Sequence, residues 1–195
     1  MQSGTRRHTR ARRHTPARRH TPARRPATGR LERGQSLVEF SLVLLPLFFI
    51  ILGLIQFGFI FNAYVTMTNA AREGARTGTI YIYDQNQSKS FNDTARNNAI
   101  KTAVTASMNL LSKTTPQFTV GGTWTSSGTT FTNGDLVVTY VIPAGLSDSD
   151  PRTGQQVTVA AQYHQDLIVP LIASLLPRDA GGRLGLAGAV TMVIN

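Results

Sequence analysis

An uncharged apolar run over residues 40–61, rich in Leu, Ile and Phe, constrains this chain more than any other feature. As an α-helix the run is about 33 Å long, because each residue adds 1.5 Å, and this length matches a bilayer core of about 30 Å. A cleaved secretory signal has an apolar region of only about 7–15 residues. We therefore interpret the run as a membrane-spanning helix, in which Pro46 is tolerated.

The net charge of +10 is confined to the N-terminus. Residues 1–34 contain eleven arginines and one acidic residue, whereas residues 35–195 contain nine basic and nine acidic residues. Six of these arginines lie in residues 11–25, which read Ala-Arg-Arg-His-Thr-Pro twice and then Ala-Arg-Arg. This repeat has almost no apolar surface to bury, so a disordered leader is predicted. Such a tract can bind nucleic acid, but beside a span a flank that contacts anionic lipid explains it more simply. A basic flank also predicts that the N-terminus is cytoplasmic and the C-terminus extracytoplasmic.

Few residues in this chain could act as catalytic or metal-binding groups. The absence of cysteine excludes disulfides and cysteine-based metal sites. After the leader, His164 is the only histidine; Asp166 follows it, but no nucleophile signature accompanies the pair, so we interpret His164 as a strand-end residue. Residues 147–151 (SDSDP) fit either a calcium loop or a solvated turn, and we favour the turn. The sequence therefore predicts no catalytic residue, cofactor, metal or small-molecule substrate, and no enzyme.

The sequence that follows the membrane-spanning run predicts one small domain. Apolar residues recur with helical spacing over residues 91–112, and Asn92 or Asp93 offers an N-cap. Three later segments place apolar residues at alternate positions, as half-buried strands do: Phe118 and Val120; Leu136, Val138 and Tyr140; and Val157, Val159, Ala161 and Tyr163. Leu184 to Ile194 is predicted as a last strand, with Leu184, Leu186, Val190, Met192 and Ile194 on one side. The apolar stretch 167–176 is too short to span, so it packs on the sheet or faces a partner. The predicted fold is α+β, with a long N-terminal transmembrane helix, a second helix and an antiparallel sheet of about four strands.

Between leader and span, the distinctive residue is Glu39, a carboxylate at the edge of the apolar run that would be costly deep in lipid. It is either an interfacial glutamate paired with Arg33 or part of a processing site. The arrangement of Gly34, Gln35 and Glu39 resembles that of type IV prepilins, which are cut after a glycine and carry a glutamate at the fifth mature position. The resemblance implies that Gly34 ends the leader and Gln35 begins the mature chain. Glu39, at i+4, would then pair with the Gln35 amine of its own or a neighbouring subunit.

Three further motifs extend this resemblance: residues 37–46 (LVEFSLVLLP), 53–58 (GLIQFG) and 69–76 (NAAREGAR). Over about residues 33–80 the chain resembles the N-terminal module of TadE-like proteins, minor pilins of the tight-adherence (Flp-type) pilus system. The resemblance implies a small pilin-like outer domain and assembly roles for Glu39 and Pro46. Its implied partners are a prepilin peptidase, other pilin-like subunits, the pilus assembly platform and the lipid bilayer, rather than nucleic acid.

The third motif supplies the juxtamembrane residues Arg72, Glu73, Gly74 and Arg76. No proline lies between the end of the span and residue 77, so the helix is expected to continue to about that residue. Arg72 and Arg76 then share one face. This face carries either ordinary interfacial charge or a collar that contacts neighbouring subunits.

The predicted organisation is a disordered, basic cytoplasmic leader (1–34), a transmembrane helix with an extracytoplasmic extension (35–77) and an exported α+β domain (78–195). Such a chain sits in the cytoplasmic membrane as a single-pass protein. The resemblance implies a minor pilin or pseudopilin of a tight-adherence pilus or related secretion apparatus. The alternative is an uncleaved membrane-anchored protein whose outer domain or leader binds an envelope partner or DNA.

Overall fold

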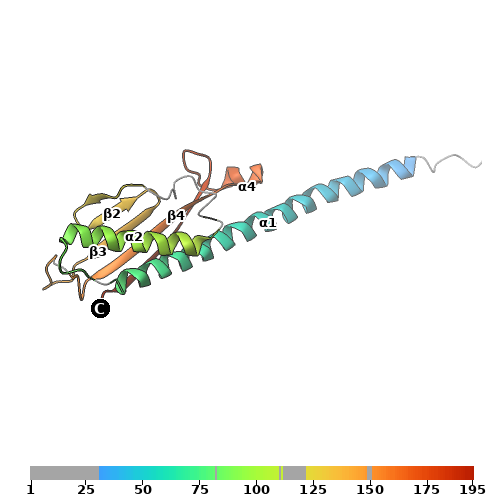
Figure 1. Cartoon of the computed structure of the whole chain (residues 1–195). Coiled ribbons are helices and arrows are strands. Elements are labelled where there is room, and N and C mark those ends of the chain that lie inside the picture. The colour runs from blue at the N-terminus through green and yellow to red at the C-terminus, as the bar shows by residue number, and fades with distance from the viewer. Residues whose placement is uncertain (1–30, 82, 110, 112–121, 149–150) are drawn as a thin grey trace, which may run out of the picture. The chain divides into compact units, whose positions relative to one another are not determined.

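The computed structural model describes residues 31–81, 83–109, 111, 122–148 and 151–195. The elements, in chain order, are the helices α1 (Leu31–Thr79) and α2 (Lys89–Met108), the strands β1 (Thr125–Ser127), β2 (Thr130–Asn133), β3 (Leu136–Val141) and β4 (Gln156–Gln165), the short helix α4 (Pro170–Leu175) and the strand β5 (Leu184–Val193) (Figure 1). The contacts divide the chain into two units, Met1–Leu44 and Leu45–Asn195. The sheet, α2, α4 and most of α1 belong to the second unit. The predicted leader up to residue 30 and the predicted strand at 118–120 lie outside the described residues.

The strands form one antiparallel sheet in which each pairs with its sequence neighbour, in the order β1-β2-β3-β4-β5. Val159 of β4 lies opposite Val138 of β3 and Val190 of β5. The predicted α+β fold is confirmed, as are the three predicted strands that lie within the described residues. The sheet has five strands rather than about four because the hairpin β1–β2 was not predicted. Its short strands consist of Thr, Ser and Asn around a single Phe131, so they show no apolar alternation.

The hydrophobic core lies between the sheet, α2 and the C-terminal half of α1. Its buried side chains come from all three: Ala63, Met67, Ala70 and Ala75 of α1; Ile100, Val104 and Met108 of α2; and Leu136, Val138, Tyr140, Val157, Val159, Ala161 and Tyr163 of the strands. The α1 residues are mostly small, which allows close approach to the sheet. At Gly188 of β5, an added Cβ would lie 3.0 Å from the Met67 backbone of α1. The second half of α1 is therefore an integral part of this domain.

Helix α2 begins earlier than predicted, at Lys89, because Ser88 rather than Asn92 or Asp93 is its N-cap. The Ser88 hydroxyl accepts a hydrogen bond from the Phe91 N–H at 3.2 Å. Asn92 instead accepts from the backbone N–H of Asp84 and donates to its carbonyl, both at 3.0 Å. The N-cap prediction was wrong because Asn92 and Asp93 are buried and bind segments outside the helix.

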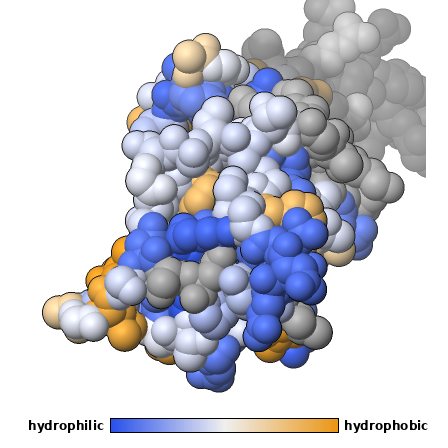
Figure 2. All heavy atoms as spheres, turned by 60° about the vertical axis from the view of Figure 1, so that its left-hand side comes forward, coloured by the Kyte–Doolittle hydropathy of each residue, from blue (hydrophilic) through white to orange (hydrophobic). Residues whose placement is uncertain are grey.

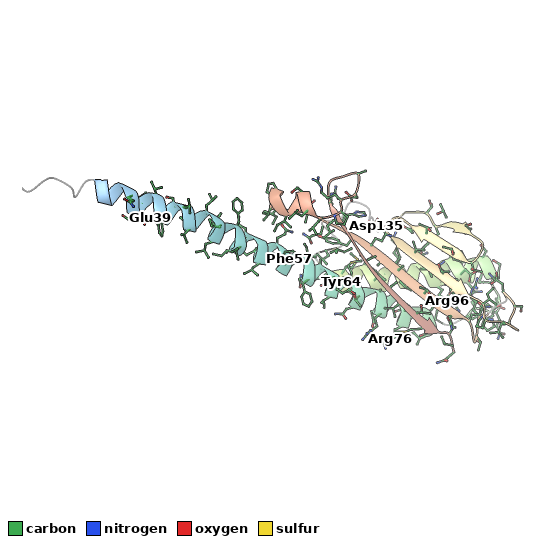
Figure 3. The ribbon with its side chains drawn as sticks, turned by 180° about the vertical axis from the view of Figure 1, so that it is seen from behind. Glu39, Phe57, Tyr64, Arg76, Arg96 and Asp135 are labelled. Atoms are coloured by element: carbon green, nitrogen blue, oxygen red, sulfur yellow. The ribbon has the colours of Figure 1, made fainter. Side chains whose placement is uncertain are left out.

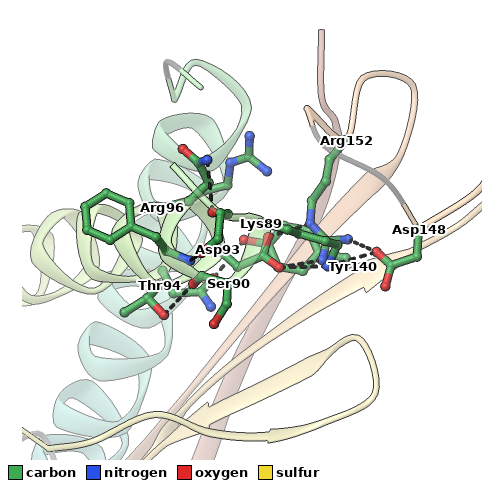
Figure 4. Close-up of polar contacts among 12 residues, drawn as sticks. Lys89, Ser90, Asp93, Thr94, Arg96, Tyr140, Asp148 and Arg152 are labelled. Atoms are coloured by element: carbon green, nitrogen blue, oxygen red, sulfur yellow. Dashed lines mark hydrogen bonds and ion pairs between the residues drawn. The ribbon is translucent and has the colours of Figure 1, made fainter. Parts of the chain in front are cut away.

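A buried ion-pair network joins α2 to the loop before β4 (Figure 4). Arg152 donates to both carboxylate oxygens of Asp93, at 2.7 and 2.8 Å, and Lys89 donates to Asp93 at 2.9 Å. The Arg152 guanidinium also lies 4.0 Å from the centre of the Tyr140 ring. Burial alone would raise the pKa of Asp93, but the hydrogen bonds from Arg152 and Lys89 outweigh it, and the pKa is lowered. Asp148, in the predicted turn, pairs with Arg152 and Lys89 at 2.8 and 3.3 Å.

Candidate membrane-anchoring and assembly site

The predicted processing junction lies inside a helix, because α1 begins at Leu31 and includes the peptide bond between Gly34 and Gln35. The Gln35 side-chain amide donates to a carboxylate oxygen of Glu39 at 3.1 Å, and both residues are exposed. Positions 35 and 39 therefore face each other across one helical turn, as the i+4 spacing predicts. In the structure the contact uses the side-chain amide of Gln35 rather than a free amine. The processing role of these residues stays a prediction.

The apolar run is the exposed part of α1. Within the described residues, one helix is long and apolar enough to cross a membrane, and it extends from Gly34 to Thr79. Large apolar side chains stay exposed along the run, among them Phe40, Leu42, Leu45, Phe48, Ile50, Leu54 and Phe61. Phe57, labelled in Figure 3, is another. Pro46 lies in the helix interior, where it removes the hydrogen bond to the Leu42 carbonyl. Exposed side chains of this kind fit a lipid environment.

The surface of the sheet domain differs from that of the apolar run. In Figure 2, which turns the left-hand side of Figure 1 forward, the visible face is mainly hydrophilic, and its hydrophobic residues form small, separate groups. Single exposed apolar side chains, such as Val141 of β3 and Leu146 in the following loop, are ordinary on a protein surface. The anchoring surface is therefore on α1 rather than on this face.

Gln56 is buried within the apolar run, and the sequence reasoning did not identify it. Its side-chain carbonyl accepts a hydrogen bond from the Ile168 N–H at 2.8 Å, and its amide nitrogen lies 3.5 Å from the Asp166 carbonyl oxygen. One turn earlier, a Cβ added at Gly53 would lie 3.6 Å from Ile172 of α4. Gln56 thus holds the segment just before α4 against α1. The only sequence signal was one amide in an apolar run, and its partners lie more than 100 residues later.

The four juxtamembrane residues divide between two sides of α1. Arg76, labelled in Figure 3, forms an exposed ion pair with Glu73 at 3.1 Å. Arg72 is also exposed, so the predicted charged face is on the surface. Gly74 instead faces the core, where an added Cβ would overlap Val104 of α2. The helix ends at Thr79, two residues beyond the expected end. Whether the charged face contacts other subunits stays a prediction.

His164 joins two loops rather than pairing with Asp166. Its Nδ1 lies 2.6 Å from a carboxylate oxygen of Asp179, and its Nε2 lies 3.3 Å from one of Asp135. Burial raises the pKa of Asp135, although the hydrogen bond with His164 opposes this shift. Asp166 is exposed and pairs with Arg183 at 3.5 Å. This cluster connects β4 to the β2–β3 turn and to the loop before β5.

These features define a class: a protein in which, among the described residues, one exposed apolar helix suited to anchoring in a membrane continues into an α+β domain. Residues 34–76 match the family model described as TadE-like protein. The match contains all three motifs, and the predicted resemblance to the TadE-like family is confirmed for this part of the chain. Neither the curated proteins nor the solved structures contain a match to this chain.

Proposed function

We propose that the chain is a minor pilin or pseudopilin, a structural or assembly component of a tight-adherence pilus or related secretion apparatus. The observation that carries this proposal is the TadE-like match over residues 34–76, which coincides with the exposed apolar helix and ends within the part of α1 buried in the sheet domain. The family association favours a structural rather than a catalytic role. Its partners are then other pilin-like subunits and the assembly platform.

In this proposal two exposed parts of α1 have different functions. The apolar surface of residues 40–61 holds the subunit in the bilayer and is available to neighbouring spans during assembly. The Gln35 amine, once exposed by a prepilin peptidase, pairs with Glu39 of the same or a neighbouring subunit. Such a pair offsets the cost of placing both charges in lipid and thereby fixes the register between subunits.

Processing is tested by the mass of the mature chain. Gly34→Ala is expected to leave the leader attached in cells that contain a prepilin peptidase, while Gly29→Ala in the same leader serves as the matched control. At the mean residue mass given by 21.2 kDa over 195 residues, the retained leader adds about 3.7 kDa. Equal masses for Gly34→Ala and wild type would argue against cleavage at this site.

Orientation is tested by protease protection. The eleven leader arginines favour a cytoplasmic N-terminus, so protease added outside cells with a permeable outer layer is expected to digest residues after Thr79 and spare the leader. Digestion of the leader with protection of the sheet domain would reverse the orientation.

A second candidate function is supported by the helical conformation at the junction. The bond after Gly34 lies within α1, whereas proteases preferentially cut exposed, irregular segments. An uncleaved chain would be a membrane-anchored binding protein, with its outer domain or basic leader contacting an envelope partner or DNA. Mass spectrometry of the native N-terminus separates the two: a chain that starts at Gln35 supports the pilin, and an intact leader supports the anchored binder.

A further inference from the structure

A second apolar surface lies far from α1 in the sequence. Residues 167–177, which include α4, contain no charged residue. Within this segment Ile168 and Leu175 are large aliphatic residues with 67% and 78% of their surface exposed. Charged residues bound it on both sides: Asp166 before it and Arg178 after it. An uncharged stretch with outward-pointing aliphatic side chains and charged ends resembles a short element that lies in a membrane surface.

The position of α4 places this surface beside the apolar run. Ile172 lies against Gly53, and the Ile168 N–H binds the Gln56 side chain, so α4 contacts α1 inside residues 40–61. The neighbouring α1 side chains Leu54 and Ile55 are themselves 68% and 50% exposed. The exposed apolar surface of α4 is therefore adjacent to the surface that anchors the chain. If α1 lies in lipid around Gly53 and Gln56, α4 contacts the same lipid.

The backbone of the segment is suited to that environment. In the absence of water, every backbone N–H and C=O needs a partner from the protein. Gln56 supplies a hydrogen-bond partner for the N–H of Ile168, which precedes α4. Within the turn, the N–H groups of Ala173 and Leu176 bind the carbonyls of Val169 and Ile172 at 2.9 and 3.2 Å. Gln56 likewise obtains a partner for its own amide, which would otherwise be costly in lipid.

We propose that residues 167–176 form a second membrane contact, in which α4 lies in the outer leaflet beside α1 and Ile168 and Leu175 contact lipid acyl chains. This inference rests on the proposed anchoring of α1 in the bilayer. The charged residues Asp166 and Arg178 then lie at the level of the lipid headgroups. The contact fixes the height and rotation of the sheet domain above the membrane, because one helix alone leaves the domain free to rotate about its axis.

Site-specific fluorescence quenching tests the proposal on the full chain. The chain contains no cysteine, so single substitutions provide unique attachment points for an environment-sensitive probe. Leu175→Cys is the test site, Leu54→Cys is the control in α1, and Val141→Cys, an exposed apolar position of β3, is the control outside the membrane. Each labelled protein is reconstituted into phosphatidylcholine–phosphatidylglycerol vesicles with or without a nitroxide on the acyl chains. Emission of the single Trp124, whose indole donates to Asn98 at 2.8 Å, verifies the fold of each variant.

The acyl-chain nitroxide is expected to quench the probes at positions 54 and 175 to a similar extent and to leave the probe at 141 bright. Quenching at 54 but not at 175, with position 175 open to aqueous iodide, would overturn this inference and leave the anchor intact. Protection of position 175 from both quenchers would also overturn it, in favour of a contact with a second copy or another protein. Loss of quenching at 54 would mean that the anchor itself is wrong.

Discussion

Arg152 donates two hydrogen bonds to Asp93 of α2 although 59 residues separate them, and both side chains are almost completely buried. The pair joins the loop before β4 to the N-terminal part of α2. Lys89 and Asp148 extend it to the surface. The orientation of α2 on the sheet therefore depends on this network as well as on apolar packing.

Removing one partner of the pair is expected to destabilise the domain strongly. Arg152→Met leaves the Asp93 carboxylate buried without its main partner, which costs about 3–5 kcal/mol of unfolding free energy. The measurement is urea unfolding of the detergent-solubilised chain, followed by Trp124 fluorescence. Arg76→Met, which breaks an exposed ion pair on α1, is the matched control and should change little. Comparable effects of the two substitutions would show that the buried pair does not hold α2.

The Arg152–Asp93 pair also makes the free energy of unfolding depend on pH. The pKa of Asp93 is lowered below its usual 3.8 in the folded protein, so the folded state holds this proton less tightly than the unfolded state. The stabilisation is therefore fully present above the unfolded pKa and is lost as the pH falls through the folded value. Asp93→Asn removes the titrating group. The difference in unfolding free energy between wild type and Asp93→Asn should be large at pH 7 and shrink below about pH 4; a constant difference would contradict this assignment.

The sequence identified those elements whose pattern is local. Alternation along Val157, Val159 and Ala161 predicted β4, and the length of the apolar run predicted the exposed part of α1. It did not predict the hairpin β1–β2, because these polar strands are defined by pairing, of β1 with β2 and of β2 with β3, rather than by burial of alternate residues.

Contacts between distant segments explain the remaining differences. Asn92 and Asp93 are residue types that commonly cap helices, as is Ser88, so residue type alone could not select among them. Arg152, which holds Asp93 in the core, lies in a loop whose position depends on the whole sheet. Gln56 was missed for the same reason: a buried amide is informative only when its partner, Ile168, is known.

Close packing of α1 against α2 predicts that Gly74 tolerates no larger residue. In Gly74→Ala the new methyl group would overlap Val104 and lie 3.3 Å from Ile100 and Val159. Overpacking of this kind costs about 1–3 kcal/mol. Gly58→Ala in the same helix is the control, because nothing lies within 4 Å of its added Cβ.

Adding Val104→Ala to Gly74→Ala provides a direct test of that mechanism. The second substitution removes the overlapping methyl group, so the double variant should be more stable than the sum of the two single effects predicts. Thermal unfolding in detergent measures all four proteins. Strict additivity would mean that the cost of Gly74→Ala arises elsewhere.

The last prediction separates an assembly role of Glu39 from an incidental surface charge. Glu39→Gln keeps nearly the same shape and removes a charge at the edge of the apolar run, so the amount of protein in the membrane should hold or rise. Assembly should nevertheless fail, because the variant no longer offers a negative partner to the Gln35 amine of a neighbouring subunit. The amount of the variant in membranes, its recovery in sheared pilus fractions and the number of pili per cell are measured together. Glu73→Gln, which removes a partly exposed carboxylate further along α1, is the control and should assemble normally. Normal pili with Glu39→Gln would show that this carboxylate takes no part in assembly. Loss of pili with both variants would indicate a general need for charge on α1 rather than a specific pair at its N-terminus.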